Sequence, residues 1–448
     1  MKKLERWGSR CSTIELESFR KGKLSKLLQS HKGQRDGETE LGYFQRNTMP
    51  HFNLYLIFAG LLAVANCQTS QPGNLPYEKI APGNTEFAFK FYRQVAPEAH
   101  KKNILFSPII ISMPLALLVL AAKSTTRSQL LSGLCFNQTD ISEQEIHRGF
   151  RHLIQKLNST EAEIQRSIGN TLFPNKKFKL RKKFLNNVKY FYQADVLPTN
   201  FENATEAENQ INNYIKEKTH GKITDIVKDL DTRAILVIIS FLYMRDYWES
   251  PFNSQNTREE DFFVDEQTTV KVPMMIKDST FKTYYDESLS CEVVQLPYKS
   301  GAIAFFILPD QGKLKQVEDG LNRDVLLKWM KSVRQQRIVL HLPKLMIRGR
   351  YDLIEILSRM GITELFTDQA DLSGITGKPE VKVTKAIHQA YLNVHENGTE
   401  AAAVTFIEIG PTSLPPEIKL NRLFMFLIMD WLTEAILLFG KVADPTKN

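Results

Sequence analysis

The sequence predicts one large α+β domain. Amphipathic helical patterns come early in the chain, and long apolar runs rich in β-branched and aromatic residues dominate later, which is typical of helices packed on large sheets. The 448 residues are 42% hydrophobic and 24% charged, so the chain can bury a sizeable core. From about Tyr77 onward no linker, internal repeat or low-complexity stretch divides the chain, and a single domain is the simplest interpretation.

Four segments are expected to form helices that pack by one face. Thr205 and Glu208 make a capping box ahead of one apolar stripe. Asp352 is expected to open, and Gly361 to close, a shorter helix. The other two segments carry apolar side chains at helical spacing and comprise residues 141–157 and 325–333.

Five apolar runs are expected to be strands, and residues 385–394 are strand-like as well. The β-branched and aromatic residues of the five runs indicate burial on both faces, and we interpret them as core without chemistry of their own. The runs comprise residues 235–244, 303–308, 338–342, 424–429 and 436–439.

The first 67 residues are expected to be absent from the mature protein. Residues 1–48 form a polar upstream extension that carries +5 of the formal charge of +8, so only +3 remains for the rest of the chain. Residues 49–67 begin with Met49 and contain a short apolar run, 54–64, below the roughly 20 residues needed to cross a bilayer. We interpret 49–67 as a secretory signal peptide and 68–448 as the mature domain. A retained signal anchor and a buried strand are the alternatives.

Cysteines and sequons fit a secreted glycoprotein. Only Cys135 and Cys291 lie in the mature domain, which excludes a disulfide scaffold; one bond between them is allowed, but we favour two unpaired thiols. Four sequons of the form Asn-x-Ser/Thr indicate glycosylation of a secreted surface. They begin at Asn137, Asn158, Asn203 and Asn397.

The sequence contains no catalytic constellation. It has no Gly-x-Ser-x-Gly elbow, no His-Glu-x-x-His, no phosphate loop and no Cys-x-x-Cys pair. His341 and His388 stand alone among apolar neighbours, and we interpret them as hydrogen-bonded structural residues. We therefore expect no enzyme, no metal and no cofactor.

Residues 396–417 break the pattern of ordinary core and ordinary loop. The segment is too long for a turn and too apolar for a solvated linker. Residues 399–409 alternate loosely, as a strand would, and the small residues 401–403 would let such a strand enter between two others. Prolines after residue 410 then stop the pairing. A strand-capable segment ahead of a proline-rich stretch is unusual in a settled fold.

Specific motifs occur along the chain in order. They are Asn-Ile-Leu-Phe-Ser-Pro at 103–108, Asp-Phe-Phe-Val-Asp at 261–265, Val-Pro-Met-Met at 272–275, Leu-His-Leu-Pro-Lys at 340–344, Asp-Leu-Ser-Gly at 371–374, Lys-Ala-Ile-His at 385–388, Gly-Thr-Glu-Ala-Ala at 398–402 and Phe-Gly-Lys-Val at 439–442. By these motifs the chain from about residue 74 onward resembles the serpin family, most closely its antitrypsin-like branch. The resemblance implies three β-sheets, about nine helices and an exposed reactive-centre loop at about 396–417.

The resemblance also implies that the loop is bait for a serine protease. The serine of the target attacks the bait bond and forms an acyl-enzyme, and the freed loop then inserts into the central sheet and drags the protease across the molecule. Each new backbone hydrogen bond gains roughly 0.5–1.5 kcal/mol, so about a dozen bonds supply on the order of 10 kcal/mol. The native fold must hold the sheet closed until cleavage, as a stored-strain switch.

Similarity to antitrypsin-like members places the hinge and the scissile bond. Inward-facing hinge residues must be small or hydroxyl-bearing to be buried, and the hinge here meets this demand, which favours an inhibitor. The bond falls at Thr412-Ser413, where no basic residue suits a trypsin-like pocket, so an elastase-like or chymotrypsin-like target is expected. Cleavage after Phe406 or Ile409 is the fallback. The hinge comprises Glu396, Gly398, Thr399, Glu400, Ala401, Ala402 and Ala403.

The resemblance assigns control of sheet opening to a polar cluster of Ser107, Ser240 and His388. The family's usual Ser two residues after Ser-Pro is Ile110 here, and its usual Asn is Ser240. These changes predict rearranged or lost hydrogen bonds around His388, at about 1–3 kcal/mol for each buried polar group left unpaired. Together with a sequon at Asn397 beside the hinge, they favour the alternative, a non-inhibitory serpin that carries a hydrophobic ligand or binds an extracellular partner.

One basic cluster has no place in the inhibitor mechanism. Binding of a polyanion to clustered cations releases counterions, and this release favours binding, so a heparin-like polyanion is a candidate partner. The alternative is that the cluster is simply a solvated surface. Apart from these partners we expect a secreted monomer that binds no nucleic acid and no membrane. The cluster comprises Lys176, Lys177, Lys179, Arg181, Lys182 and Lys183.

Overall fold

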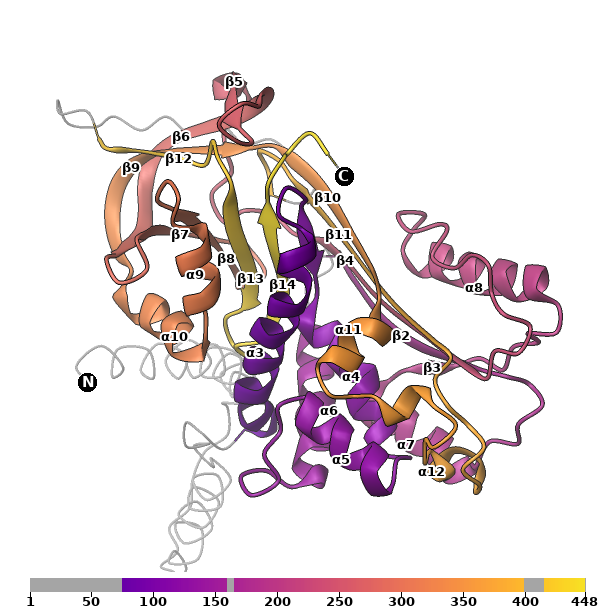
Figure 1. The fold of residues 1–448 in the computed structure, drawn as a ribbon. Helices are drawn as coiled ribbons and strands as arrows, with labels where there is room; N and C mark the ends of the chain where they lie inside the picture. The colour runs from indigo at the N-terminus through magenta and orange to yellow at the C-terminus, as the bar shows by residue number, and fades with distance from the viewer. Residues whose placement is uncertain (1–74, 159–164, 399–414, 448) are drawn as a thin grey trace, which may run out of the picture. The chain divides into compact units, whose positions relative to one another are not determined.

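A five-stranded sheet, in the order β10-β11-β4-β2-β3, forms the centre of the domain (Figure 1). The computed structural model describes residues 75–158, 165–398 and 415–447, so the segments assigned to the upstream extension and the signal peptide lie outside it. The strands of this central sheet are β2 (Gln165–Pro174), β3 (Asp195–Val196), β4 (Leu236–Arg245), β10 (Leu345–Asp352) and β11 (Lys385–Val394).

The middle of the central sheet is a parallel pair. β4 and β11 run in register from Lys385 opposite Val237 to Tyr391 opposite Tyr243. On either side, β2 is antiparallel to β4 and β10 is antiparallel to β11. Because parallel ladders are slightly less stable per residue than antiparallel ones, the weaker ladder runs between β4 and β11.

Both faces of the central sheet are buried, as its apolar runs predicted. Along β4, Ile238 and Leu242 belong to the main core, whereas Val237 and Ile239 belong to a second, smaller core. Figure 1 shows α8 (Ala204–Lys218) on one side of the sheet and α4 (Pro108–Val119) with α6 (Glu143–Leu157) on the other. Successive side chains of a strand point to opposite faces, so each face contributes to one of the two cores.

A second sheet contains nine strands, in the order β1-β14-β13-β8-β7-β6-β9-β12 with β5 paired to β6. The resemblance implied three sheets; two of them are continuous here because the 18-residue β6 pairs in turn with β5, β9 and β7. The strands are β1 (Ile104–Phe106), β5 (Arg258–Phe263), β6 (Thr269–Asp286), β7 (Cys291–Pro297), β8 (Ala302–Pro309), β9 (Arg334–Pro343), β12 (Glu417–Lys419), β13 (Phe424–Asp430) and β14 (Ile436–Val442).

Ten α-helices fall within the described residues, against about nine implied by the resemblance. The four predicted helical segments are present as α6, α8, α10 and α11, and each predicted strand is present. Besides α4, α6 and α8, the helices are α3 (Pro76–Val95), α5 (Ser124–Gly133), α7 (Lys182–Tyr192), α9 (Leu314–Gly320), α10 (Arg323–Ser332), α11 (Leu353–Arg359) and α12 (Ser373–Thr376), with 3₁₀ turns at Ala96–Glu98, Ser254–Asn256 and Glu364–Phe366.

The predicted capping box of α8 is wrong. The helix begins earlier, because the side-chain Oδ1 of Asn203 accepts the Glu206 N–H at 3.2 Å and makes Asn203 the N-cap. Asparagine is at least as good an N-cap as threonine, so Thr205 falls inside the first turn. Glu208 accepts the N–H of Leu230 at 2.8 Å instead and fastens the segment that follows the helix.

Cys135 and Cys291 are both free thiols, as predicted. Across the described ranges, no helix combines the length and the apolar character that a membrane span requires. No group of His, Cys, Asp or Glu side chains in the same ranges is placed to hold a metal ion.

Candidate functional site

The base of the loop segment is a tight turn at the end of β11. The N–H of His395 donates to the Gly398 carbonyl at 2.9 Å, and the Gly398 N–H donates back to the His395 carbonyl at 3.0 Å. Gly398 has a φ of 125°, and a Cβ at this position would lie 2.4 Å from the carbonyl oxygen of Asp246. Other residues neither adopt this φ readily nor fit this space, so the turn requires glycine.

Trp248 holds this turn from the segment that follows β4. Its backbone N–H donates to the Asn397 carbonyl at 2.9 Å, and its indole Nε1–H donates to the His395 carbonyl at 3.0 Å. The ring is 1% exposed and stacks on Tyr298 with the ring centroids 4.2 Å apart. Two donors from one buried residue therefore fix the start of the loop against the end of β4.

Glu396 is the charged residue of the loop base and is 8% exposed. Its Oε1 accepts from the Thr257 hydroxyl at 2.8 Å, and its Oε2 lies 3.0 Å from Lys344 Nζ. Burial acts to raise the pKa of Glu396, but backbone and side-chain hydrogen bonds and the Lys344 charge outweigh burial and hold this pKa below its ordinary value. The side chain is thus an ionised carboxylate that ties the loop base to two other segments. Thr257 directly precedes β5, and Lys344 directly follows β9.

Ser107, Ser240 and His388 are brought together across the parallel pair. Ser240 on β4 is directly opposite His388 on β11. The backbone N–H of Ser107 donates to His388 Nε2 at 2.9 Å, so Nε2 carries no proton. The proton of the neutral ring is on Nδ1, which donates to Ser240 Oγ at 3.1 Å. Burial disfavours the charged ring and lowers the pKa of His388 to about 3.

The departures from the family pattern leave both ring nitrogens of His388 paired. Ile110 is fully buried and contributes no hydrogen bond from its side chain. The Ser240 hydroxyl reaches the Ile387 carbonyl only at 3.4 Å, and Ser107 Oγ has no hydrogen-bond partner within residues 75–158, 165–398 and 415–447. The hydrogen bonds of the cluster are therefore complete at the imidazole of His388, whereas the two serine hydroxyls are poorly hydrogen-bonded.

The other end of the loop segment leads to the edge of the second sheet. Val339 donates its N–H to the Pro416 carbonyl at 2.9 Å, and β12 then runs parallel to β9. The segment thus connects the central sheet to the second sheet. The remaining predicted hinge residues and the predicted bond lie outside the described residues, namely Thr399, Glu400, Ala401, Ala402, Ala403, Thr412 and Ser413.

The sequon asparagines differ in exposure. Asn137, Asn158 and Asn203 are exposed, whereas Asn397 is half-buried in the turn at the loop base. Asn158 Nδ2 donates to Gln193 Oε1 at 3.1 Å. A glycan is bulky and needs a solvent-facing amide, so the first three positions suit one better than Asn397 does.

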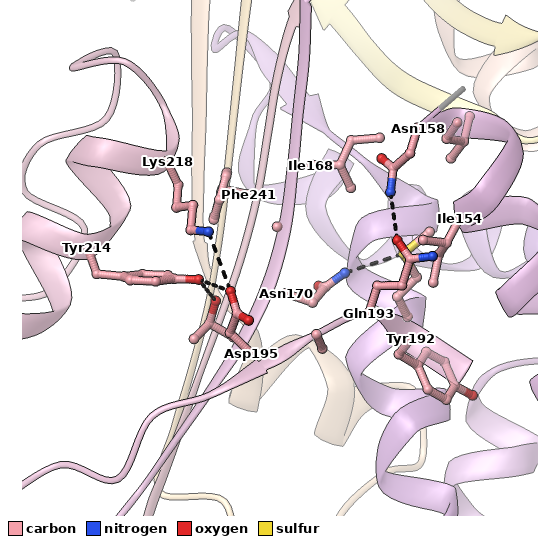
Figure 2. A pocket seen from close by; sticks show the side chains of 15 residues that line it. Ile154, Asn158, Ile168, Asn170, Tyr192, Gln193, Asp195, Tyr214, Lys218 and Phe241 are labelled. Atoms are coloured by element: carbon pink, nitrogen blue, oxygen red, sulfur yellow. Dashed lines mark hydrogen bonds and ion pairs between the residues drawn. The ribbon is translucent and has the colours of Figure 1, made fainter. Parts of the chain in front are cut away.

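A cavity of about 160 Å³ lies beside Asn158, between β2, α6 and α8 (Figure 2). In Figure 2 the side chains of Tyr214 and Lys218 point toward Asp195, which accepts the Tyr214 hydroxyl and lies 3.6 Å from Lys218 Nζ. Asn170 Nδ2 donates to Met113 Sδ at 3.3 Å. The side chains of Asp195, Tyr214 and Lys218 pair with one another, whereas Asn170 Oδ1 has no hydrogen-bond partner among the described residues.

The six cations of the basic cluster are all exposed, on the turn between β2 and α7 and on the first turn of α7. None of them makes an ion pair with any residue in the described part of the chain. β2 ends at Pro174 opposite Leu236, near Lys385 at the start of β11, whereas the loop base follows Val394. The cluster therefore lies at the end of the central sheet away from the loop base.

Sequence reasoning missed the roles of Trp248, Thr257 and Lys344 at the loop base. Thr257 and Lys344 are 139 and 52 positions from Glu396 along the chain, beyond the reach of any local pattern. The available signal was Glu396 itself, an acidic residue two positions after the end of a buried strand, because a carboxylate there needs partners.

Comparison with known proteins agrees with this geometry. A family model described as serpin (serine protease inhibitor) matches residues 82–445. Alpha-1-antiproteinase 2 of Equus caballus is 47% identical over 370 residues, which cover 83% of this chain and 88% of that protein. Alpha-1-antitrypsin of Sus scrofa is 44% identical over 370 residues, with the same coverage of 83% and 88%.

Solved structures give the same result. Human thyroxine-binding globulin matches with a TM-score of 0.79 and 37% identity, over 83% of this chain and 99% of that chain. Human glycosylated kallistatin matches with a TM-score of 0.78 and 40% identity, also over 83% and 99%. The protein belongs to the serpin family, and the predicted α+β serpin fold is confirmed. It is related to the alpha-1-antiproteinases and is not an enzyme.

Proposed function

We propose that this serpin inhibits a serine endopeptidase by forming a trapped acyl-enzyme and inserting the residues after Gly398 into the central sheet. Its relationship to the alpha-1-antiproteinases supports this function. The observation that carries the proposal is the position of the loop base, which Trp248 holds at the end of the parallel β4–β11 pair.

Strand direction explains why this position matters. A strand that turns back after β11 runs antiparallel to β11, and because β4 is parallel to β11, it is antiparallel to β4 as well. Insertion would exchange one parallel ladder for two antiparallel ladders, which are more stable per residue. With roughly 0.5–1.5 kcal/mol for each added hydrogen bond, about a dozen bonds give on the order of 10 kcal/mol, comparable with the stability of a whole domain.

Contacts on both sides of the pair oppose this insertion before cleavage. The Ser240–His388 hydrogen bond crosses directly from β4 to β11 and has to break when a strand comes between them. The hydrogen bonds of Trp248 and the ion pair between Glu396 and Lys344 hold the loop base in its turn. These contacts keep the sheet closed, and they set the rate at which it opens.

The proposed target is an elastase-like or chymotrypsin-like protease. With the scissile bond at Thr412-Ser413, a short β-branched residue enters the specificity pocket of the protease, and no cation is present for the acidic pocket of a trypsin-like one.

The test is incubation of the mature protein with purified pancreatic elastase, chymotrypsin and trypsin, followed by a denaturing gel. We expect a covalent complex that resists SDS with elastase or chymotrypsin, and a large rise in melting temperature after loop cleavage. Thr399→Arg should turn the inhibitor into a cleaved substrate, because a buried charge in the inserted strand is strongly unfavourable. Cleavage of the unaltered protein with neither a complex nor a rise in melting temperature would contradict the proposal.

That contradictory outcome would favour the second candidate, a serpin that carries a hydrophobic ligand. Similarity to a thyroxine-binding globulin that was solved with thyroxine supports it. The apolar Ile110, which stands where the family usually has a Ser of the polar cluster, is the feature of this chain that favours it.

We further propose that the protein is secreted, with residues 49–67 as its signal peptide, and glycosylated at Asn137, Asn158 and Asn203. The exposure of these three asparagines supports glycan attachment. Expression in mammalian cells should release the protein into the medium, with an N-terminus near Gln68 and a mass that falls on treatment with an N-glycanase.

The basic cluster supports a further partner, a heparin-like polyanion. Six exposed cations without a described ion-pair partner would release counterions on binding a polyanion. Lys182 and Lys183 begin α7, where the helix dipole disfavours cations, so an anion bound there would relieve this repulsion.

A further inference from the structure

A second cavity, of about 290 Å³, is lined in part by Trp248, the residue that holds the loop base. It is bounded by β6, β7, the start of β8, the start of β9 and residues 248–250. Its lining mixes apolar and aromatic side chains with eight polar or charged residues, among them Glu249, Lys277 and Lys282, so a ligand there would meet both apolar surface and polar groups. The residues that matter for the argument are Trp248, Lys277, Phe281, Gln295, Leu296 and Ile303.

Gln295 provides an unpaired donor in this wall. The residue is 3% exposed, and its side-chain Nε2 has no hydrogen-bond partner in the part of the chain that the structure describes. Buried side-chain amides are normally hydrogen-bonded, so an unpaired amide at a cavity wall indicates a ligand acceptor that completes it. The lateral cavity beside Asn158 offers no equally buried amide, because Asn170 is only half-buried.

Lys277 defines the charge of the ligand. Its ammonium donates to the Ser250 carbonyl at 2.9 Å and lies 5.8 Å from the centre of the Phe252 ring and 5.9 Å from that of Phe281. An ammonium beside aromatic rings and an amide donor suits an anionic oxygen attached to a flat apolar body. Phe281, Leu296 and Trp248 are buried and offer the apolar contact area for such a body.

We propose that this cavity binds a small aromatic carboxylate, with Gln295 and Lys277 at its carboxylate and Trp248 against its ring. Because Trp248 also donates to His395 and Asn397, an occupant that packs on its ring stabilises the closed loop base and slows insertion. This second effect rests on the proposed inhibitory function, whereas binding itself does not.

Binding is tested with 4-iodobenzoate as the probe, because iodine quenches the fluorescence of an adjacent indole. The mature domain contains Trp248, Trp329 and Trp431, of which Trp431 is 48% exposed, so a Trp431→Phe background removes collisional quenching at the surface. We expect saturable quenching with one site per chain. Absence of saturable quenching at millimolar probe overturns the proposal.

Two variants locate the site. Gln295→Leu keeps the volume but removes the donor and should weaken binding about tenfold, the effect of one hydrogen bond to a charged group. Ile303→Trp fills the cavity and should abolish binding, which is measured by calorimetry for this variant because its new indole adds to the fluorescence. Lys218→Ala at the lateral cavity is the matched control that should leave the affinity unchanged. Unfolding midpoints of all three verify that they fold. Unchanged affinity in folded Gln295→Leu and Ile303→Trp overturns the proposal.

The effect on the loop is measured as the rate of complex formation with elastase at saturating 4-iodobenzoate. The rate should fall severalfold in the unaltered protein and remain the same in Ile303→Trp. An unchanged rate with the cavity occupied contradicts the coupling to Trp248. If no complex forms at all, the proposed inhibitory function fails, and the quenching titration still decides the binding site.

Discussion

The backbone N–H of Ser107 lies 2.9 Å from Nε2 of His388, and this contact fixes the protonation of the ring. A backbone amide only donates, so Nε2 must accept, and a proton added at Nε2 would place two donors against each other. The same ring donates from Nδ1 to Ser240 on the partner strand. The neutral form of His388 thus links the start of α4, β11 and β4 in one chain of hydrogen bonds.

Stability should therefore fall in mild acid. The pKa of His388 is about 3 in the folded protein, against 6.5 for an ordinary histidine, so below pH 6.5 the unfolded chain takes up a proton that the folded chain does not. The stabilisation is complete above about pH 6.5 and is lost progressively between about pH 6.5 and 3, by at most about 1.4 kcal/mol for each pH unit. Denaturant unfolding between pH 7 and 5 measures this slope.

His388→Gln is the control, because the amide keeps a polar group in place and does not titrate. Its free energy of unfolding should depend less on pH than that of the unaltered protein in this window. Equal slopes in the two proteins would show that His388 does not titrate on unfolding.

A second prediction concerns the carboxylate of the loop base. Glu396→Gln leaves Lys344 without its counter-charge and should lower the free energy of unfolding by about 1–3 kcal/mol. Because the Lys344 side chain is 38% exposed, the coupling between the two residues should be smaller, about 0.5–1 kcal/mol. A double-mutant cycle with Lys344→Gln measures it. Full additivity of the two substitutions would exclude a direct interaction.

A third prediction separates backbone strain from steric conflict at Gly398. Gly398→Ala should destabilise the closed turn by about 1–3 kcal/mol, because it adds an unfavourable φ and a contact with the Asp246 carbonyl. Gly377→Ala is matched to it, since Gly377 has a φ of 105° and no atom within 4 Å of the added Cβ. Denaturant unfolding and proteolysis of the loop should show a larger effect at Gly398 than at Gly377. Equal effects would mean that the Asp246 contact is unimportant.

Local patterns predicted the elements well and the connections between them poorly. Residues 385–394 are β11 with the same bounds, and Asp352 caps α11 by accepting the Ile354 N–H at 3.3 Å. Both features depend on neighbouring residues. The cap of α8 was misplaced because two adequate caps, Asn203 and Thr205, lie within three positions, and a local pattern does not decide between them.

The site required more than local patterns. The family resemblance identified Ser107, Ser240 and His388 as a group, but the resemblance did not predict which ring nitrogen accepts, since that depends on the position of one backbone N–H. The cavity at Gln295 was also beyond prediction, because five separate segments form its wall. Nothing in the spacing of one segment reveals a gap among five.

A fourth prediction tests the scissile bond. Thr412→Arg places a cation at the proposed bait position, so the protein should gain complex formation with trypsin by at least about a hundredfold and lose it with elastase. N-terminal sequencing of the cleaved loop should begin at Ser413. Phe406→Arg is the control, and a gain of trypsin inhibition from this variant instead would move the bond to the fallback position.

The last prediction concerns the basic cluster. Replacing Lys176, Lys177 and Lys179 by Gln should lower the salt concentration that elutes the protein from immobilised heparin, and reduce the slope of log affinity against log salt by up to about 3. The exposed Lys102, Lys313 and Lys331, replaced together, change the charge equally and should leave elution almost unchanged. If the two triple variants lowered the elution salt equally, retention on heparin would depend on overall charge and not on this cluster.

Sheet geometry extends this prediction to the protease complex. Because the cluster is at the end of the central sheet where β11 starts, an inserted loop carries the cleaved bond toward it, and the protease arrives beside these cations. A trapped protease should then compete with the polyanion for space. The covalent complex should elute from heparin at lower salt than the free serpin does, and elution at the same salt would place the protease elsewhere.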